Sequence, residues 1–178
     1  FGMTAASIMG ISVEQILKRA VEMAEQCRAD DPVANPGALL GVILGVCHRN
    51  GRDKLTIFTS PEIYDVGAWL EQLIAESTGK NGVAIIPIDR EPLLTPDHYG
   101  DDRVFVNLTL KGSRLDDEEF YKLSEIEKAG HPYINIEVET IYHLGQEFFR
   151  WEFATAVAGA IMNINPFNQP DVEAAKIE

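Results

Sequence analysis

Residues 54–88 read "KLTIFTSPEIYDVGAWLEQLIAESTGKNGVAIIPI", and their pattern decides the fold. Residues 54–60 have the short apolar centre of a buried strand, and Ser60-Pro61 then opens a helical pattern that continues to Thr78. Residues 82–88 form a second apolar run that is typical of a buried strand. A strand, a helix and a second strand in this order predict two parallel strands joined by a right-handed crossover.

The rest of the chain continues this alternation on both sides of residues 54–88. Apolar runs predict further strands at 103–110 and 131–139, and helical spacing predicts helices at about 12–28, 36–49, 116–129 and 145–164, with a short last helix at 171–178. We therefore expect an α/β protein, a three-layer sandwich whose mostly parallel sheet is covered on both faces. Its four strands, near 54–59, 84–88, 103–109 and 133–138, should be parallel. Ligands of such sheets bind outside the carboxyl ends of the strands.

Two helices carry recognisable start signals. Ser12 stands three residues before Gln15 in a capping-box pattern. Asn35 can cap the next helix, with a proline at its first helical position. This helix is apolar on almost all sides, and its spaced glycines would allow a neighbouring helix to come close. Those glycines are Gly37, Gly41 and Gly45.

Composition limits the class of protein and its partners. The chain has 178 residues and is 46% hydrophobic, which suits one globular domain. Its net charge of −13 argues against nucleic acid and anionic membranes as partners, because both require clustered Lys and Arg. Cys27 and Cys47 lie among apolar residues, which favours free thiols over a disulfide. No signal-peptide pattern and no membrane-spanning apolar run are present, so we expect a cytoplasmic protein.

Glu76 stands in the last turn of the helix predicted between the first two strands. A carboxylate is unfavourable there, because a helix C-terminus carries partial negative charge. The residue could simply be a solvated helix end, paired with Lys80 one turn later. It could instead be a general base, because a helix end and an apolar pocket both disfavour the charged form and so make the carboxylate a stronger base.

Three stretches together resemble one enzyme family. "WLEQLIAESTGKNGVAIIP" (69–87) resembles the Glu-Ser-x-Gly-Lys segment of bacterial phosphoglucose isomerases, and "FFRWEFATAVAGAIMNINPFNQPDVEAAK" (148–176) resembles their C-terminal helix and Asn-Pro-Phe-x-Gln-Pro loop. "FGMTAASIMGI" (1–11) is similar to the segment that follows the family's Gly-Gly-Arg turn. The sequences of these three stretches are most similar to the isomerase half of fused transaldolase–phosphoglucose isomerases. The resemblance covers essentially the whole chain and implies the C-terminal sugar-isomerase (SIS) domain of a longer chain, with a flavodoxin-like sheet of five parallel strands.

The resemblance also implies roles for individual residues. Glu76 matches the family's catalytic base, and Gln72, one turn earlier, matches a glutamine that lines the substrate site. Lys176 matches the lysine that donates to the sugar ring oxygen during ring opening, and Gln169 matches a loop glutamine of the substrate site. The family's ring-opening histidine has its nearest counterpart in His98, in "TPDHYG", although the spacing to the glycine differs.

The implied reaction interconverts glucose 6-phosphate and fructose 6-phosphate and needs no cofactor. The Ser/Thr-rich phosphate loop belongs to the family's N-terminal isomerase domain, which we expect as a partner in the same chain, so residues 1–178 alone should be inactive. A homo-oligomer is also compatible with the apolar segment "FFRWEF" (148–153). Two alternatives remain open: an SIS module that binds phosphosugars for regulation without turnover, and a domain used only for dimerisation.

Overall fold

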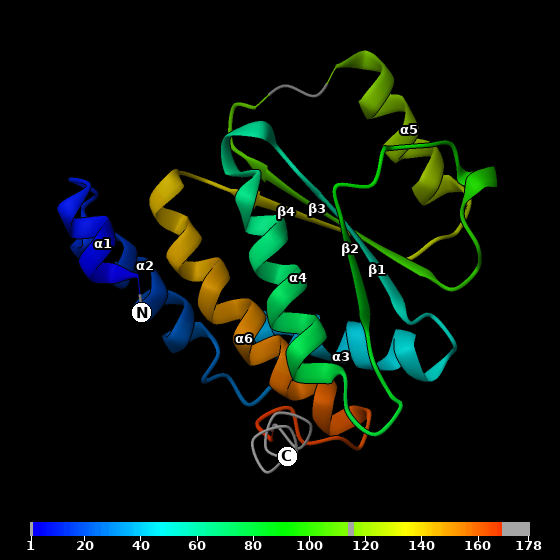
Figure 1. Cartoon of the computed structure of the whole chain (residues 1–178), viewed down its shortest axis with the longest axis horizontal. Helices are drawn as coiled ribbons and strands as arrows, with labels where there is room; N and C mark the ends of the chain where they lie inside the picture. Colours follow the sequence, from blue (N-terminus) through cyan, green and yellow to red (C-terminus); the bar gives the residue numbers. More distant parts are fainter. Residues whose placement is uncertain (1, 114–115, 169–178) are drawn as a thin grey trace, which may run out of the picture.

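The computed structural model describes residues 2–113 and 116–168, which form one sheet with helices on both faces (Figure 1). The strands are β1 Lys54–Thr59, β2 Ile86–Asp89, β3 Arg103–Leu110 and β4 Tyr133–Val138. Their order is β2-β1-β3-β4, and all three pairings are parallel. The predicted α/β class and parallel sheet are therefore confirmed. The four strands predicted from the apolar runs are confirmed, whereas the five-stranded sheet implied by the resemblance is not, because the described residues form four strands.

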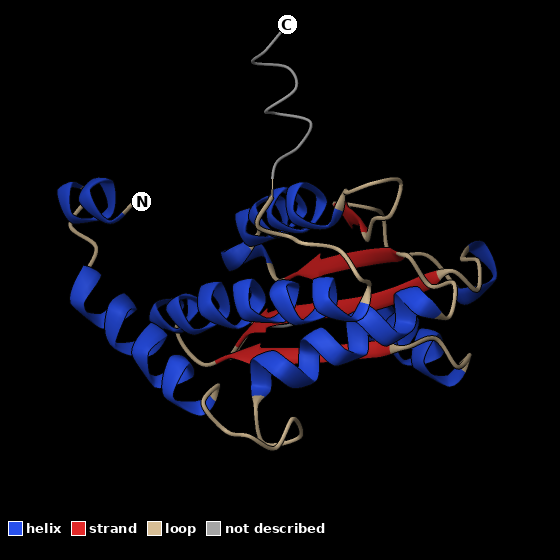
Figure 2. Cartoon of the chain, turned by 90° about the horizontal axis from the view of Figure 1, so that it is seen from below, coloured by secondary structure: helices blue, strands red, loops and turns tan. Residues whose placement is uncertain are grey.

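Six α-helices and three short 3₁₀ helices complete the described part of the chain. The α-helices are α1 Met3–Ile8, α2 Val13–Gln26, α3 Pro36–Arg49, α4 Asp65–Thr78, α5 Asp117–Lys128 and α6 Leu144–Ile161. The 3₁₀ helices are η1 Pro61–Ile63, η2 Pro96–His98 and η3 Ile141–His143. Helix α1 lies at the outer end of α2, away from the sheet (Figures 1 and 2). None of the helices in residues 2–113 and 116–168 is long and apolar enough to cross a bilayer.

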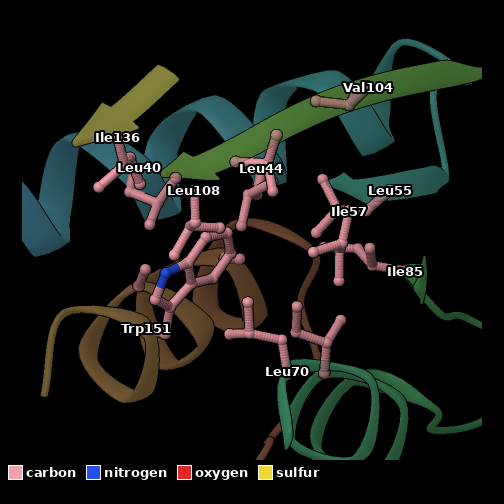
Figure 3. Close-up of a cluster of buried hydrophobic side chains, with 14 of the residues drawn as sticks. Leu40, Leu44, Leu55, Ile57, Leu70, Ile85, Val104, Leu108, Ile136 and Trp151 are labelled. Atoms are coloured by element: carbon pink, nitrogen blue, oxygen red, sulfur yellow. The ribbon is translucent and has the colours of Figure 1, made fainter. Parts of the chain in front are cut away.

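The main core lies between the sheet and the layer formed by α3, α4 and α6. Leu40 and Leu44 from α3, Leu70 from α4 and Trp151 from α6 point toward the same face of the strands (Figure 3). On the other face, α5 and the segment 90–102 cover a smaller cluster, in which the Tyr99 and Phe105 rings lie 4.9 Å apart. The two faces follow from the right-handed crossovers, because β1 leads to β2 on one side and β3 leads to β4 on the other.

The predicted helix starts are confirmed where side chains satisfy the free backbone N–H groups. The Ser12 hydroxyl accepts from the backbone N–H of Gln15 at 3.5 Å. Asn35 is buried, accepts from the backbone N–H of Ala38 at 2.8 Å and donates to the carbonyl oxygen of Cys27 at 2.7 Å. Asn35 therefore fixes the end of α2 to the start of α3. Cys27 and Cys47 are free thiols, as expected.

One strand start differs from the prediction. Residues 82–85 precede β2, because Lys80 and Val83 pair with each other in a tight turn. Ile86, at the start of β2, is 45% exposed, since β2 is an edge strand. An apolar run shows that a segment is buried on average, but it does not show at which residue the pairing begins.

The close approach of α3 to α6 gives a stability prediction. A Cβ at Gly41 would lie 2.5 Å from the carbonyl oxygen of Ala154 and 2.6 Å from Cβ of Val157. We expect Gly41→Ala to lower the free energy of unfolding, because overpacking costs about 1–3 kcal/mol and the gain in helix propensity is only about 1 kcal/mol. Denaturant unfolding would measure the effect, with Val46→Ala on the exposed side of α3 as the control. An unchanged midpoint for Gly41→Ala would show that the two helices separate without cost.

Candidate active site

Glu76 lies in the last turn of α4, at the edge of the sheet where the strands begin. Helix α4 starts after β1 ends and runs back against the strand direction toward the start of β2. Two residues after Glu76, the Thr78 hydroxyl accepts from the backbone N–H of Ile85 at 2.9 Å, immediately before β2. We expected the site at the carboxyl ends of the strands, and for Glu76 this was wrong. The helix of a strand–helix–strand unit is antiparallel to its strands, so its last turn reaches the opposite edge.

Gln72 and Glu76 form a side-chain pair on the outer surface of α4. The Gln72 amide Nε2 donates to Oε1 of Glu76 at 3.1 Å, across one helical turn. Both side chains are exposed, so the described residues do not form the apolar pocket that we expected around Glu76. The carboxylate is therefore oriented by Gln72 and open to a ligand, or to another protein surface, on its outer side.

The end of α4 is stabilised by several independent contacts. The Thr78 hydroxyl donates to the carbonyl oxygen of Ile74 at 2.8 Å. The backbone N–H of Gly79 donates to the carbonyl oxygen of Ala75 at 3.0 Å, and a Cβ at Gly79 would lie 2.8 Å from that oxygen. The chain then reverses through Asn81 and Gly82, whose φ angles of 54° and 77° fit a two-residue type I′ turn. Both glycines of the Glu-Ser-x-Gly-Lys-x-Gly segment are therefore required by the backbone. At Gly79 a Cβ would be too close to the carbonyl oxygen of Ala75, and Gly82 has a positive φ angle.

Lys80 makes a different contact from the one that its spacing suggested. Its Nζ donates to the backbone carbonyl oxygen of Glu76 and not to the carboxylate, and the residue is only 6% exposed. The expected Glu76–Lys80 ion pair is therefore wrong, whereas the exposed Glu76 side chain agrees with the other part of that alternative, a solvated helix end. Sequence reasoning missed this role, although lysine side chains near a helix C-terminus can bind the last carbonyl groups.

His98 lies on the other side of the sheet from Glu76. It ends η2, in the segment that crosses the α5 face, and the neighbouring Tyr99 packs against Phe105 of β3 on that face. Its Nδ1 lies 3.0 Å from the Thr95 hydroxyl, and its side chain is exposed. The structure therefore does not bring His98 and Glu76 together within one chain.

Gln169 and Lys176 lie outside the described residues. The described chain ends at residue 168, shortly after α6, which packs against α4 and, like α4, runs against the strand direction. Both helices therefore end at the same edge of the sheet, as Figure 1 shows. Ile164 packs on the main core, which keeps residues 162–164 at this edge.

An apolar groove of about 920 Å³ lies beside the first half of α4. It is formed between α1, α2, α4, η3 and α6, and the rings of Trp69 and Phe148 meet in it at 4.8 Å. Asp65 and Trp69 line the groove, and Gln72 and Glu76 continue the same stripe of α4 at helical spacing. The groove and the candidate base therefore share one side of the helix. Within residues 2–113 and 116–168, no group of three His, Cys, Asp or Glu side chains could hold a metal ion.

No protein-family model matches the chain, but curated proteins do. The glucose-6-phosphate isomerase of Methanocaldococcus jannaschii is 28% identical over 207 aligned residues, which cover 98% of this chain and 52% of that protein. Those of Parabacteroides distasonis and Exiguobacterium sibiricum are each 26% identical, and cover 98% of this chain and 47% of their own lengths. The chain thus spans about half the length of the curated relatives that it matches.

A solved structure supports the fold independently. A hypothetical protein from Thermus thermophilus superposes with a TM-score of 0.74 at 15% identity, covering 94% of this chain and 49% of that chain. At this identity the match concerns the fold alone. The curated sequence relatives confirm the resemblance inferred from the three motifs: over nearly its whole length, this chain is similar to phosphoglucose isomerases.

Proposed function

We propose that this chain is the C-terminal sugar-isomerase domain of a glucose-6-phosphate isomerase and supplies the base of that reaction. The match to glucose-6-phosphate isomerases over 98% of the chain carries this proposal. It is supported by the Gln72–Glu76 pair, which holds a carboxylate at the position that the family resemblance gives to the base.

The proposed chemistry needs one carboxylate that can reach two neighbouring carbons. Glu76 removes the proton from C2 of the open-chain glucose 6-phosphate, the C–H electron pair forms the C1–C2 double bond, and the electron pair of the C1 carbonyl moves to O1, which takes up a proton to give a cis-enediol. The same carboxyl group then returns the proton to C1, while the O2 hydroxyl group loses its proton and becomes the C2 carbonyl of fructose 6-phosphate. No electron leaves the sugar, so no nicotinamide is required, and proton transfer by a carboxylate does not itself need a metal. Gln72, 3.1 Å from the carboxylate, limits the rotation of Glu76 and so keeps it directed at both carbons.

Because Glu76 is exposed, this proposal requires the N-terminal isomerase domain of the same chain to cover it. That domain supplies the phosphate loop and covers the side of α4 that carries the apolar groove and Glu76. Covering this side would exclude water from the reacting carbons and strengthen the electrostatic contacts there. The same proposal includes an upstream transaldolase domain, homo-oligomerisation and a cytoplasmic location. In the cytoplasm the Cys27 and Cys47 thiols would stay reduced.

The remaining site residues keep the roles that the resemblance gives them. Lys176 donates a proton to the ring oxygen during ring opening, and Gln169 holds substrate hydroxyl groups. His98 remains the candidate ring-opening histidine, with the sheet between it and Glu76 of the same chain.

A regulatory module that binds phosphosugars without turnover is the second candidate function. The exposed position of Glu76 favours it, because a base that stays in water is poorly placed for catalysis. Such a module would not need Glu76 and Lys176 together.

Lys176→Ala in the complete isomerase chain separates the two functions. We expect turnover of ring-closed glucose 6-phosphate to fall by about 10²-fold, the lower end of the effect of a positioned proton donor. The loss should be smaller for a substrate supplied in open-chain form, because Lys176 acts in ring opening. A coupled assay of both substrates would measure this, with Lys111→Ala, an exposed lysine just after β3, as the control. Phosphosugar binding without turnover in the unmodified chain would support the regulatory function instead.

A further inference from the structure

We infer that Lys80 is a positioning residue for the base, because it holds the backbone of Glu76 while leaving its carboxylate free. The inference rests on the proposed role of Glu76. Lys80 has no place in the reaction described above, and its ammonium group binds the main chain of Glu76 instead of the atoms that would react.

The last turn of a helix is a mobile place for a catalytic group. The last four carbonyl groups of a helix lack partners within it, and helix ends fray. In α4 the backbone N–H of Gly79 satisfies the carbonyl of Ala75, and the Lys80 ammonium satisfies the carbonyl of Glu76. The peptide group of the candidate base is therefore held by a charged donor. Since cations are favoured at helix C-termini, this contact also offsets the partial negative charge beneath Glu76.

Lys80 is itself held in place, so the contact can position Glu76. Its backbone pairs with Val83 through two hydrogen bonds of 2.9 Å on either side of the Asn81-Gly82 turn. The residue is buried, and a buried ammonium group is costly unless it is paired. Moving Nζ away from the Glu76 carbonyl would leave both groups without this hydrogen bond. Hydrogen bonds therefore join the turn, Lys80 and the last turn of α4 into one unit.

Lys80 and Gln72 divide the contacts of Glu76 between them. Gln72 binds Oε1 of the carboxylate, and Lys80 binds the main-chain oxygen. If the ammonium bound the carboxylate instead, it would occupy the oxygens that must accept the C2 proton. The arrangement fixes the position of the carboxylate without a charged partner on it. Precise placement matters, since a displacement of about 1 Å can cost about 10²-fold in rate.

Lys80→Met in the complete isomerase chain tests this inference. Methionine keeps most of the buried chain and removes the donor and the charge. We expect kcat to fall by about 10-fold to 10²-fold, with KM changed by less than about threefold, because substrate binding does not use Lys80. Lys80→Arg, which restores a cationic donor, should recover most of the lost kcat. If Lys80→Met does not fold, Lys80→Gln should show the same loss of kcat, because its uncharged amide is too short to replace the ammonium group.

Thr78→Val provides the matched structural control. Thr78 also fastens the end of α4, through Ile74 and Ile85, but it makes no hydrogen bond with Glu76. We expect Thr78→Val to lower the unfolding midpoint at least as much as Lys80→Met does, while kcat stays within about twofold at a temperature where both variants are folded. Equal losses of kcat in Thr78→Val and Lys80→Met would overturn the inference, because Lys80 would then act only through stability.

Glu76→Gln measured in parallel distinguishes the two possible failures. If Glu76→Gln is inactive and Lys80→Met is as active as the unmodified enzyme, the positioning role of Lys80 is wrong and the proposed function stands. If Glu76→Gln retains full activity, the proposed function is wrong, and the inferred role of Lys80 is wrong as well.

Discussion

Glu76→Gln is expected to remove nearly all turnover of the complete isomerase while leaving its fold intact. Glutamine has the shape of glutamate and can keep a hydrogen bond with Gln72, but it cannot accept the C2 proton. General base catalysis contributes about 10²–10⁴-fold, so kcat should fall by this factor or more with little change in KM. The exchange of the C2 proton with deuterated solvent should stop in the same variant. Because the Glu76 side chain is exposed, the unfolding midpoint should not change.

Glu71→Gln is the matched control for this experiment. Glu71 is also an exposed glutamate of α4, but it lies outside the stripe of Asp65, Trp69, Gln72 and Glu76. Glu71→Gln removes one negative charge from α4, as Glu76→Gln does, so the kcat of this variant should remain within about twofold of that of the unmodified enzyme. Equal activity of Glu76→Gln and Glu71→Gln would mean that Glu76 is only a solvated helix end.

The chain of residues 1–178 is expected to show no useful isomerase turnover by itself. The phosphate site is expected in the N-terminal isomerase domain, and remote phosphate binding normally supplies energy that is used at the reacting carbons. The described structure adds a second reason, since the Glu76 carboxylate is exposed when only this domain is present. A coupled assay of the purified chain with fructose 6-phosphate would measure the residual rate against that of the complete chain.

Addition of the N-terminal isomerase domain in trans is the informative control for the isolated chain. Partial recovery of activity would show that the missing part supplies the phosphate site and covers α4. Turnover by the isolated chain near that of the complete enzyme would contradict the prediction, and would show that the phosphate is bound by residues 1–178.

The parallel sheet was predictable from short segments of sequence. The β1–α4–β2 unit follows from one alternation of apolar runs and helical spacing within residues 54–88, because a parallel pair needs a crossover. The α3–α6 contact was predictable in part, since the spaced glycines of α3 indicated a close neighbour. The identity of that neighbour was not, because Gly41 and Val157 are brought together only when the whole chain folds.

The candidate site was predictable only as a set of residue types. The motif resemblance identified Gln72 and Glu76, and the structure joins them by a hydrogen bond. It did not show that Glu76 is exposed, that Lys80 binds its main-chain oxygen, or that His98 lies on the α5 face. These properties depend on partners that are distant in sequence or on the direction in which a side chain turns.

The sequence by itself determined the alternation of strands and helices, the apolar side of each element and the resemblance to phosphoglucose isomerases. These depend on local backbone preference and on the period of apolar residues, which each segment carries within itself. Only the tertiary structure decided that Glu76 lies at the amino ends of the strands and that the sheet separates it from His98. The physical reason is the direction of the chain: α4 must run back against β1 before β2 can lie parallel to it. The crossovers to β2 and β4, which leave the centre of the sheet in opposite directions, must cover opposite faces to remain right-handed.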